Sequence, residues 1–146
     1  MRLKPVRTKL GLSSAVLLAC AAAGVTLSLL AAEKAPESYA KLMKEAGATA
    51  GSLRKDSTAK DYSGVSSDAE KFRSIYAEAK TFWDARHDET ASSALSAGAK
   101  AAEELQAGAQ SKNDESIASA SQALMKTCAT CHGAHREKVG DGFEIK

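Results

Sequence analysis

Five residues near the end of the chain, Cys128-Ala129-Thr130-Cys131-His132, have the types and the spacing of a covalent haem attachment motif, C-x-x-C-H. Cysteines three positions apart lie one helical turn apart, so their thiols can reach the two vinyl groups of a single haem. The histidine that follows Cys131 then falls under the iron as its proximal ligand. The sequence therefore predicts one covalent haem c, held by Cys128, Cys131 and His132.

A C-x-x-C pair has two other common uses in proteins. A thioredoxin-like redox pair occurs in a βαβ context, which this sequence does not show. A zinc site needs further ligands at suitable spacing. The export signal at the start of the chain adds to the case for haem.

Residues 1–32 have the pattern of a secretory signal peptide. A positively charged n-region comes first and contains Arg2, Lys4, Arg7 and Lys9. The segment 10–32 then carries no charged residue, as the apolar region of a signal does. We expect export to the periplasm with cleavage near Ala31-Ala32. The alternative is an uncleaved membrane anchor that leaves the protein facing the periplasm, because an apolar run of about 23 residues is long enough to span a bilayer.

Cleavage of the signal peptide changes the number of cysteines and the net charge. Cys20 reads as a small apolar residue of the signal rather than a lipoprotein acylation site, since apolar sequence continues beyond it. Its removal leaves Cys128 and Cys131 as the only cysteines, both free for haem. Four of the 20 Lys and Arg residues leave with the signal while all 18 Asp and Glu residues remain, so the net charge changes from +2 to −2. This balance does not support a nucleic-acid partner, and a membrane partner is expected only if the signal is retained.

Residues 33–146 read as one all-α domain, because no proline follows Pro36 and alanine is abundant. Apolar residues recur at helical spacing in four segments, about 36–55, 61–86, 88–108 and 113–138. The predicted capping residues are Asp61, Asp88 and Asn113. Short connections make neighbouring helices antiparallel, which predicts an up-down-up-down four-helix bundle with the haem at one end. The segment 139–146 reads as a polar tail with a turn signal at Asp141-Gly142.

The haem motif and the bundle together resemble the class II cytochromes c, the cytochrome c-prime family. The run Cys128-Ala129-Thr130-Cys131-His132-Gly133-Ala134-His135-Arg136 is similar to that family's C-x-x-C-H-x-x-[aromatic or His]-Arg pattern. The resemblance covers residues 33–146 in size, number of helices and position of the motif on the last helix. It implies that one haem face meets the last helix and the other face the first. Family members with five-coordinate iron bind small gases, whereas six-coordinate members carry electrons and supply a methionine from the first helix.

Met43 is the candidate for that second axial ligand. It lies roughly 10 Å from the start of the first helix, and His132 lies roughly 9 Å from the end of the last; these ends adjoin in this topology. The two side chains therefore reach the same level of the bundle. Spacing alone leaves open that Met43 is core filler and that Leu42 caps a vacant site. The resemblance to the six-coordinate members favours ligation by Met43.

Other candidate ligands are weaker on geometric grounds. Met125 and His135 share a helix with His132, so neither can reach the opposite haem face. His87 lies in the loop at the haem end, which leaves bis-histidine ligation as an alternative to a solvated loop histidine. We expect His135 beside the porphyrin edge or in solvent, and Arg136 paired with a haem propionate or at the protein surface.

These observations predict a periplasmic c-type cytochrome that transfers single electrons through a His/Met-ligated haem and is not an enzyme. Its expected partners are redox proteins of the periplasm, and a homodimer is one of the two oligomeric states found in the family. The alternative is a five-coordinate binder of small gases such as NO and CO. A third reading is a helical module whose haem is structural. The sequence shows no set of residues for hydrolysis or nucleotide chemistry.

Overall fold

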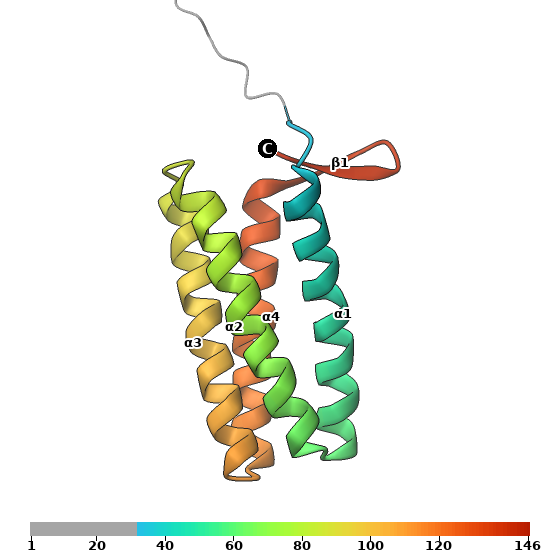
Figure 1. Ribbon diagram of the computed structural model, residues 1–146, viewed down its shortest axis with the longest axis vertical. Helices are drawn as coiled ribbons and strands as arrows, with labels where there is room; N and C mark the ends of the chain where they lie inside the picture. The colour runs from blue at the N-terminus through green and yellow to red at the C-terminus, as the bar shows by residue number, and fades with distance from the viewer. Residues whose placement is uncertain (1–31) are drawn as a thin grey trace, which may run out of the picture. The chain divides into compact units, whose positions relative to one another are not determined.

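The computed structural model describes residues 32–146 (Figure 1). Apart from Ala32, the predicted signal segment 1–32 lies outside the described residues, and so do Cys20 and the expected cleavage site. Within the described part of the chain, no helix combines the length and the apolar character that crossing a bilayer requires. The domain predicted from residue 33 onward is described in full.

Four antiparallel helices form the bundle that the sequence predicts (Figure 1). Their bounds are α1 Glu37–Ala59, α2 Tyr62–Asp84, α3 Glu89–Gln110 and α4 Asp114–His135. The α1–α2 and α3–α4 connections lie at one end of the bundle, and the α2–α3 connection lies at the other, beside the start of α1 and the end of α4. The fold is therefore up-down-up-down, and its first and last helices meet at a defined end.

Side-chain caps fix the starts of three helices, as the sequence predicts. The Asp61 carboxylate accepts a hydrogen bond from the backbone N–H of Gly64 at 3.0 Å, before α2. Asp88 and Asn113 accept equivalent bonds at 2.8 and 3.0 Å before α3 and α4. Each cap satisfies a backbone donor that the first turn of a helix leaves without a partner. The helix starts therefore agree with the predicted positions to within one residue.

The core is built largely by α2 and the small residues of α3. The α2 side chains Val65, Phe72 and Ile75 are fully or almost fully buried. On α3, a Cβ added at Gly98 would lie 2.8 Å from the ring of Tyr76, so the two helices approach too closely there for any larger residue. The small residues of this helix therefore serve close packing.

The segment after α4 differs from the prediction. The last helix ends at His135 rather than near 138, and the expected polar tail is instead a hairpin of two strands, β1 Arg136–Val139 and β2 Gly142–Ile145. Gly140 supplies the positive φ of 56° that the tight turn needs. Ile145 is buried and contributes to the core, which gives this hairpin a hydrophobic anchor. The turn predicted at Asp141-Gly142 is present. The prediction of a polar tail without strands around it was wrong.

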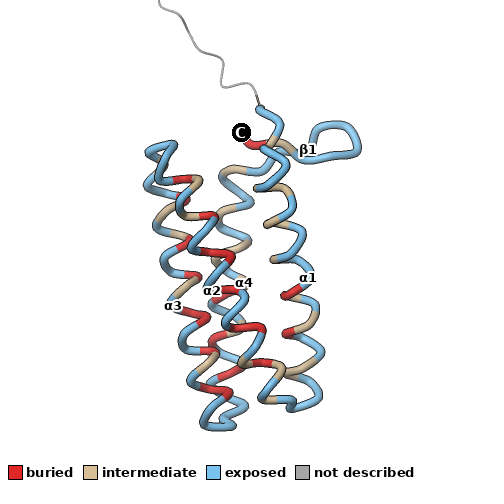
Figure 2. Tube along the Cα trace, in the orientation of Figure 1, coloured by how far each residue is buried: buried red, intermediate tan, exposed pale blue. Residues whose placement is uncertain are grey.

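The first helix is packed on one side only. It lies against α2 and makes few contacts with α4. Leu53 of this helix is buried, whereas Tyr39, Met43, Ala46 and Ala50 are only half-buried, and little of α1 is coloured as buried in Figure 2. The second half of α4 likewise has no buried residue after Leu124. The apolar faces of the first and last helices are thus left incompletely covered at the end where the hairpin lies.

Candidate functional site

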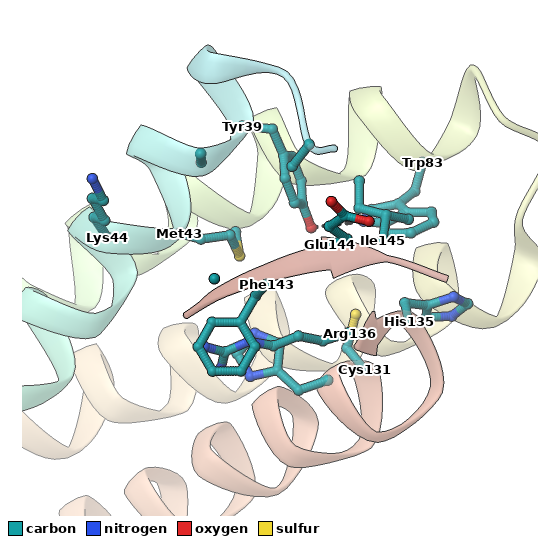
Figure 3. A pocket seen from close by; sticks show the side chains of 14 residues that line it. Tyr39, Met43, Lys44, Trp83, Cys131, His135, Arg136, Phe143, Glu144 and Ile145 are labelled. Carbon is teal, nitrogen blue, oxygen red and sulfur yellow. Dashed lines mark hydrogen bonds between the residues drawn. The ribbon is translucent and has the colours of Figure 1, made fainter. Parts of the chain in front are cut away.

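A cavity of about 360 Å³ lies between these two incompletely covered faces (Figure 3). Helix α1 forms one wall, the end of α4 forms another, β2 supplies a third, and Trp83 of α2 also contributes. Most of the lining is apolar and includes Ala35, Met43 and Ile145. The volume falls within the range of about 300–1,000 Å³ that is usual for small-molecule and cofactor sites.

Four of the five residues predicted for the haem site line this one cavity. Met43 comes from α1, Cys131 and His132 come from the last turns of α4, and Arg136 begins β1. In Figure 3 the sulfurs of Met43 and Cys131 point toward the same space from opposite helices. The fold therefore brings together side chains that are far apart in the sequence.

Cys128 is the one predicted site residue that does not line the cavity. It is half-buried one turn before Cys131, and its Sγ lies 3.3 Å from the hydroxyl oxygen of Tyr76 on α2. Burial raises the pKa of the Tyr76 hydroxyl, and the neighbouring Cys128 thiol adds to the rise. The two thiols of the motif thus have different surroundings, one against the α2 wall and one at the cavity.

The surroundings of His132 favour the neutral form of its imidazole. Partial desolvation against the cavity wall lowers the pKa of its imidazole, and the positive charge of Arg136 lowers it further. The neutral imidazole, whose unprotonated nitrogen can bind a metal, is therefore favoured at neutral pH. The pKa of the Cys131 thiol is raised by burial, then by the nearby Cys128 and Asp88, so this sulfur keeps its proton. Both cysteines are free thiols.

The other candidate ligands lie in three different surroundings. His135 lies at the cavity edge, where its ring packs 4.6 Å from that of Trp83 and its Nδ1 lies 3.6 Å from a carboxylate oxygen of Asp88. Of its two expected places, the structure shows burial at the cavity rather than exposure to solvent. His87 is exposed and does not line the cavity, and Met125 packs half-buried against the core.

Arg136 extends over the ring of Phe143, with its guanidinium carbon 3.4 Å from the ring centroid. This contact is a cation–π interaction across the hairpin. The residue is also exposed, so it remains at the cavity rim with donors available to an anionic group. The sequence left open a choice between a propionate partner and the protein surface, and the rim position is compatible with both.

Two parts of the cavity lining were not predicted from the sequence. One is β2, because a four-residue strand that pairs locally gives only a weak alternating pattern, here Phe143 and Ile145. The other is a pair of aromatic side chains, Tyr39 and Trp83, whose polar atoms meet at the cavity: the indole Nε1–H donates to the Tyr39 hydroxyl at 2.9 Å. Both aromatics were visible as apolar positions on their helices, but nothing local shows that they touch.

The residues around the cavity fit a haem. The donor set contains an imidazole and a free thiol from the end of α4 and a thioether from α1, in a cavity with a mostly apolar lining. An Arg side chain stands at the rim, as a propionate requires. Cys128 is the least favourably placed member, since its sulfur contacts Tyr76 and lies behind the cavity wall.

Comparisons with known proteins supply no relative: a scan against family models, a search of curated proteins and a search of solved structures all return no match. Among residues 32–146, no group of three or more His, Cys, Asp or Glu side chains is arranged to hold a metal ion. The function is therefore argued from the motif and the geometry of this cavity.

Proposed function

We propose that the cavity holds one haem, covalently attached through Cys128 and Cys131, and that the protein carries single electrons in the periplasm. The observation that carries the proposal is the joint lining of one cavity by Met43, Cys131 and His132. An imidazole and a thioether on facing helices are the axial pair of electron-transferring cytochromes. The resemblance of the motif to class II cytochromes c supports the same assignment.

Each side chain has a separate task in this proposal. Cys131 and Cys128 tether the group, His132 binds the iron on one side, and the Met43 sulfur binds it on the other. Arg136 lies at the rim, where it would pair with a propionate. When bound, the haem supplies one-electron oxidation and reduction, and thioether ligation favours the ferrous state and so raises the potential.

The mostly apolar lining suits electron transfer because it lowers the polarity around the centre. The proposal includes no conversion of a substrate, so it assigns the protein no enzymatic activity. The partners are redox proteins of the periplasm, which the predicted net charge of −2 after export distinguishes from nucleic-acid partners. A homodimer and retention of the signal as an anchor are both compatible with this role.

The alternative function is the binding of a small gas such as NO or CO at an open sixth position. The observation that favours it is the space left between α1 and α4, since Met43 is only half-buried and borders a cavity instead of a filled core. In that case Met43 is a wall residue and not a ligand. The two functions differ in the coordination of one iron, which makes them easy to separate.

The test is to produce the exported protein with a c-type haem maturation system and to record its spectrum. A covalent haem remains on the chain through denaturation and acid-organic extraction, and it is lost when Cys128→Ala and Cys131→Ala are combined. A low-spin ferric spectrum supports the electron carrier, and a high-spin spectrum with ready uptake of carbon monoxide supports the gas binder. Release of all haem on extraction of the native protein contradicts both.

A further inference from the structure

The hydroxyl of Tyr39 is the one phenol that reaches into the cavity. Tyr39 lies one helical turn before Met43 on α1, and its side chain points into the same space as the Met43 sulfur (Figure 3). The position is fixed by neighbours on α2: the Tyr39 ring stacks on Phe82 with centroids 4.2 Å apart and meets Trp83 edge-on at 6.2 Å. The hydroxyl is therefore held at a definite place in the wall.

This hydroxyl has a donor that residues 32–146 leave without an acceptor. Its oxygen accepts the hydrogen bond from the Trp83 indole Nε1–H at 2.9 Å. An indole N–H can only donate, so the phenol cannot return its own proton to Trp83. Across residues 32–146 the hydroxyl makes no other hydrogen bond with the protein. Burial raises its pKa, which keeps the proton on the oxygen at neutral pH.

The surroundings of the hydroxyl make that donor selective. Most of the cavity lining is apolar and includes Ala35, Ala40, Met43 and Ile145, while Lys44 and Glu144 add charged side chains to it. A hydrogen-bond donor in a mostly apolar cavity forms a stronger electrostatic interaction than the same group in water. The polarity and the hydrogen-bond donors on the distal side of a haem determine which ligands it holds and how.

We propose that Tyr39 donates a hydrogen bond to a small diatomic ligand that occupies the place of the Met43 sulfur, with Trp83 orienting the hydroxyl. The inference rests on the proposed haem site, because it concerns the cavity face opposite His132. It assigns the pocket a preference for diatomics whose outer atom accepts a hydrogen bond. It also makes Trp83 a positioning residue, since the indole reaches the ligand only through Tyr39.

Carbon monoxide is the probe, because its stretching frequency reports on a hydrogen bond to its oxygen. The Met43→Ala variant, loaded with haem and reduced, presents an open site whether or not Met43 is a ligand. Its carbonyl band is compared with that of Met43→Ala combined with Tyr39→Phe, which removes the hydroxyl and leaves the ring. We expect the band to move to higher frequency and carbon monoxide to dissociate faster in the double variant.

The matched control is Tyr62→Phe in the same Met43→Ala background. The Tyr62 hydroxyl donates to Asp114 at 3.0 Å at the far end of the bundle, so its loss leaves the carbonyl band unchanged. A second measurement uses Met43→Ala alone: exchange of the hydroxyl proton for deuterium shifts the carbonyl band if Tyr39 donates to it. If the protein holds its haem and the carbonyl band responds to neither Tyr39→Phe nor deuterium exchange, this inference is wrong. A chain that binds no haem overturns the proposed function instead.

Discussion

Met43 of α1 and His132 of α4 line one cavity from two helices that otherwise make few contacts with each other. Helix-length arithmetic places them at one level of the bundle, and the fold keeps open the space between their helices. If side chains filled the space between α1 and α4, Met43 and His132 would be ordinary packing residues. In the proposed function, their position at the cavity makes them the two residues that would bind the iron.

Replacement of the thioether tests this pair directly. Met43→Ala is expected to convert a low-spin haem to a high-spin form with a lower reduction potential, because the ligand that favours ferrous iron is gone. The measurements are the absorption spectrum and a potentiometric titration. Met125→Ala is the matched control, since Met125 packs against the core away from the cavity and its loss leaves the spectrum unchanged. A wild-type protein that is already high-spin shows that Met43 is a wall residue.

The two histidines of the last helical turns are expected to differ sharply. His132→Ala removes the proximal ligand and abolishes the normal spectrum, whereas His135→Ala leaves the iron ligands intact because His135 is held against Trp83 and Asp88. Spectra of the two variants at equal haem content provide the comparison. Equal loss of the low-spin spectrum in both would remove the basis for assigning His132 alone.

The helices were predictable because their signals are local. Asp61, Asp88 and Asn113 each bind a backbone N–H three residues ahead, so the signal and the structure it produces lie within one turn. The hairpin was not predictable in this way. Its stability depends on burial of Ile145 and on its pairing with Glu33 from the other end of the domain, where each residue's N–H donates to the other's carbonyl at 2.7 and 2.8 Å.

Only part of the cavity lining was predictable from the sequence. Spacing alone identifies Cys131 and His132, and the level of Met43 follows from helix geometry. The contact of Cys128 with Tyr76 depends on the rotation of α4 against α2, which no local pattern encodes. The same holds for the Tyr39 to Trp83 hydrogen bond, in which two residues that read as core side chains share a polar contact.

Close packing of α3 on α2 leads to a stability prediction. In Gly98→Ala the new methyl group would lie 2.8 Å from the Tyr76 ring, so the ring or the helix must shift. We expect the free energy of unfolding to fall by about 1–3 kcal/mol. Gly47→Ala is the control: no atom lies within 4 Å of the new methyl group, and the variant is expected to gain about 0.5–1 kcal/mol from reduced backbone entropy. Chemical denaturation measures both, and equal effects would contradict the packing argument.

The opposite end of the bundle has a pH-dependent contact. A hydrogen bond from Lys60 and a second from Tyr62 lower the pKa of the Asp114 carboxyl. Such a group stabilises the fold above its unfolded pKa of about 4, and this contribution is lost as the pH falls through the lowered folded value. Asp114→Asn is therefore expected to weaken the decline of unfolding free energy toward acid, and Lys60→Gln to do so in part. Denaturation between about pH 2 and pH 7 tests this, and an unchanged acid decline contradicts it.

The hairpin is expected to act as a wall of the cavity and not as a tail. Ile145 is buried and lines the cavity, so Ile145→Ala should lower the free energy of unfolding by about 2 kcal/mol, the low end for a core isoleucine because the site is at the edge. Loss of this anchor should also release the pairing with Glu33, so the amide protons of Glu33 and Ile145 exchange with solvent faster. Val139→Ala is the control from the same hairpin, since Val139 is 44% exposed and its truncation is expected to change stability by less than about 0.5 kcal/mol. Hydrogen exchange of the Glu33 amide separates the two variants. If this amide is equally protected in both, the hairpin is held by its own turn and does not depend on burial of the Ile145 side chain.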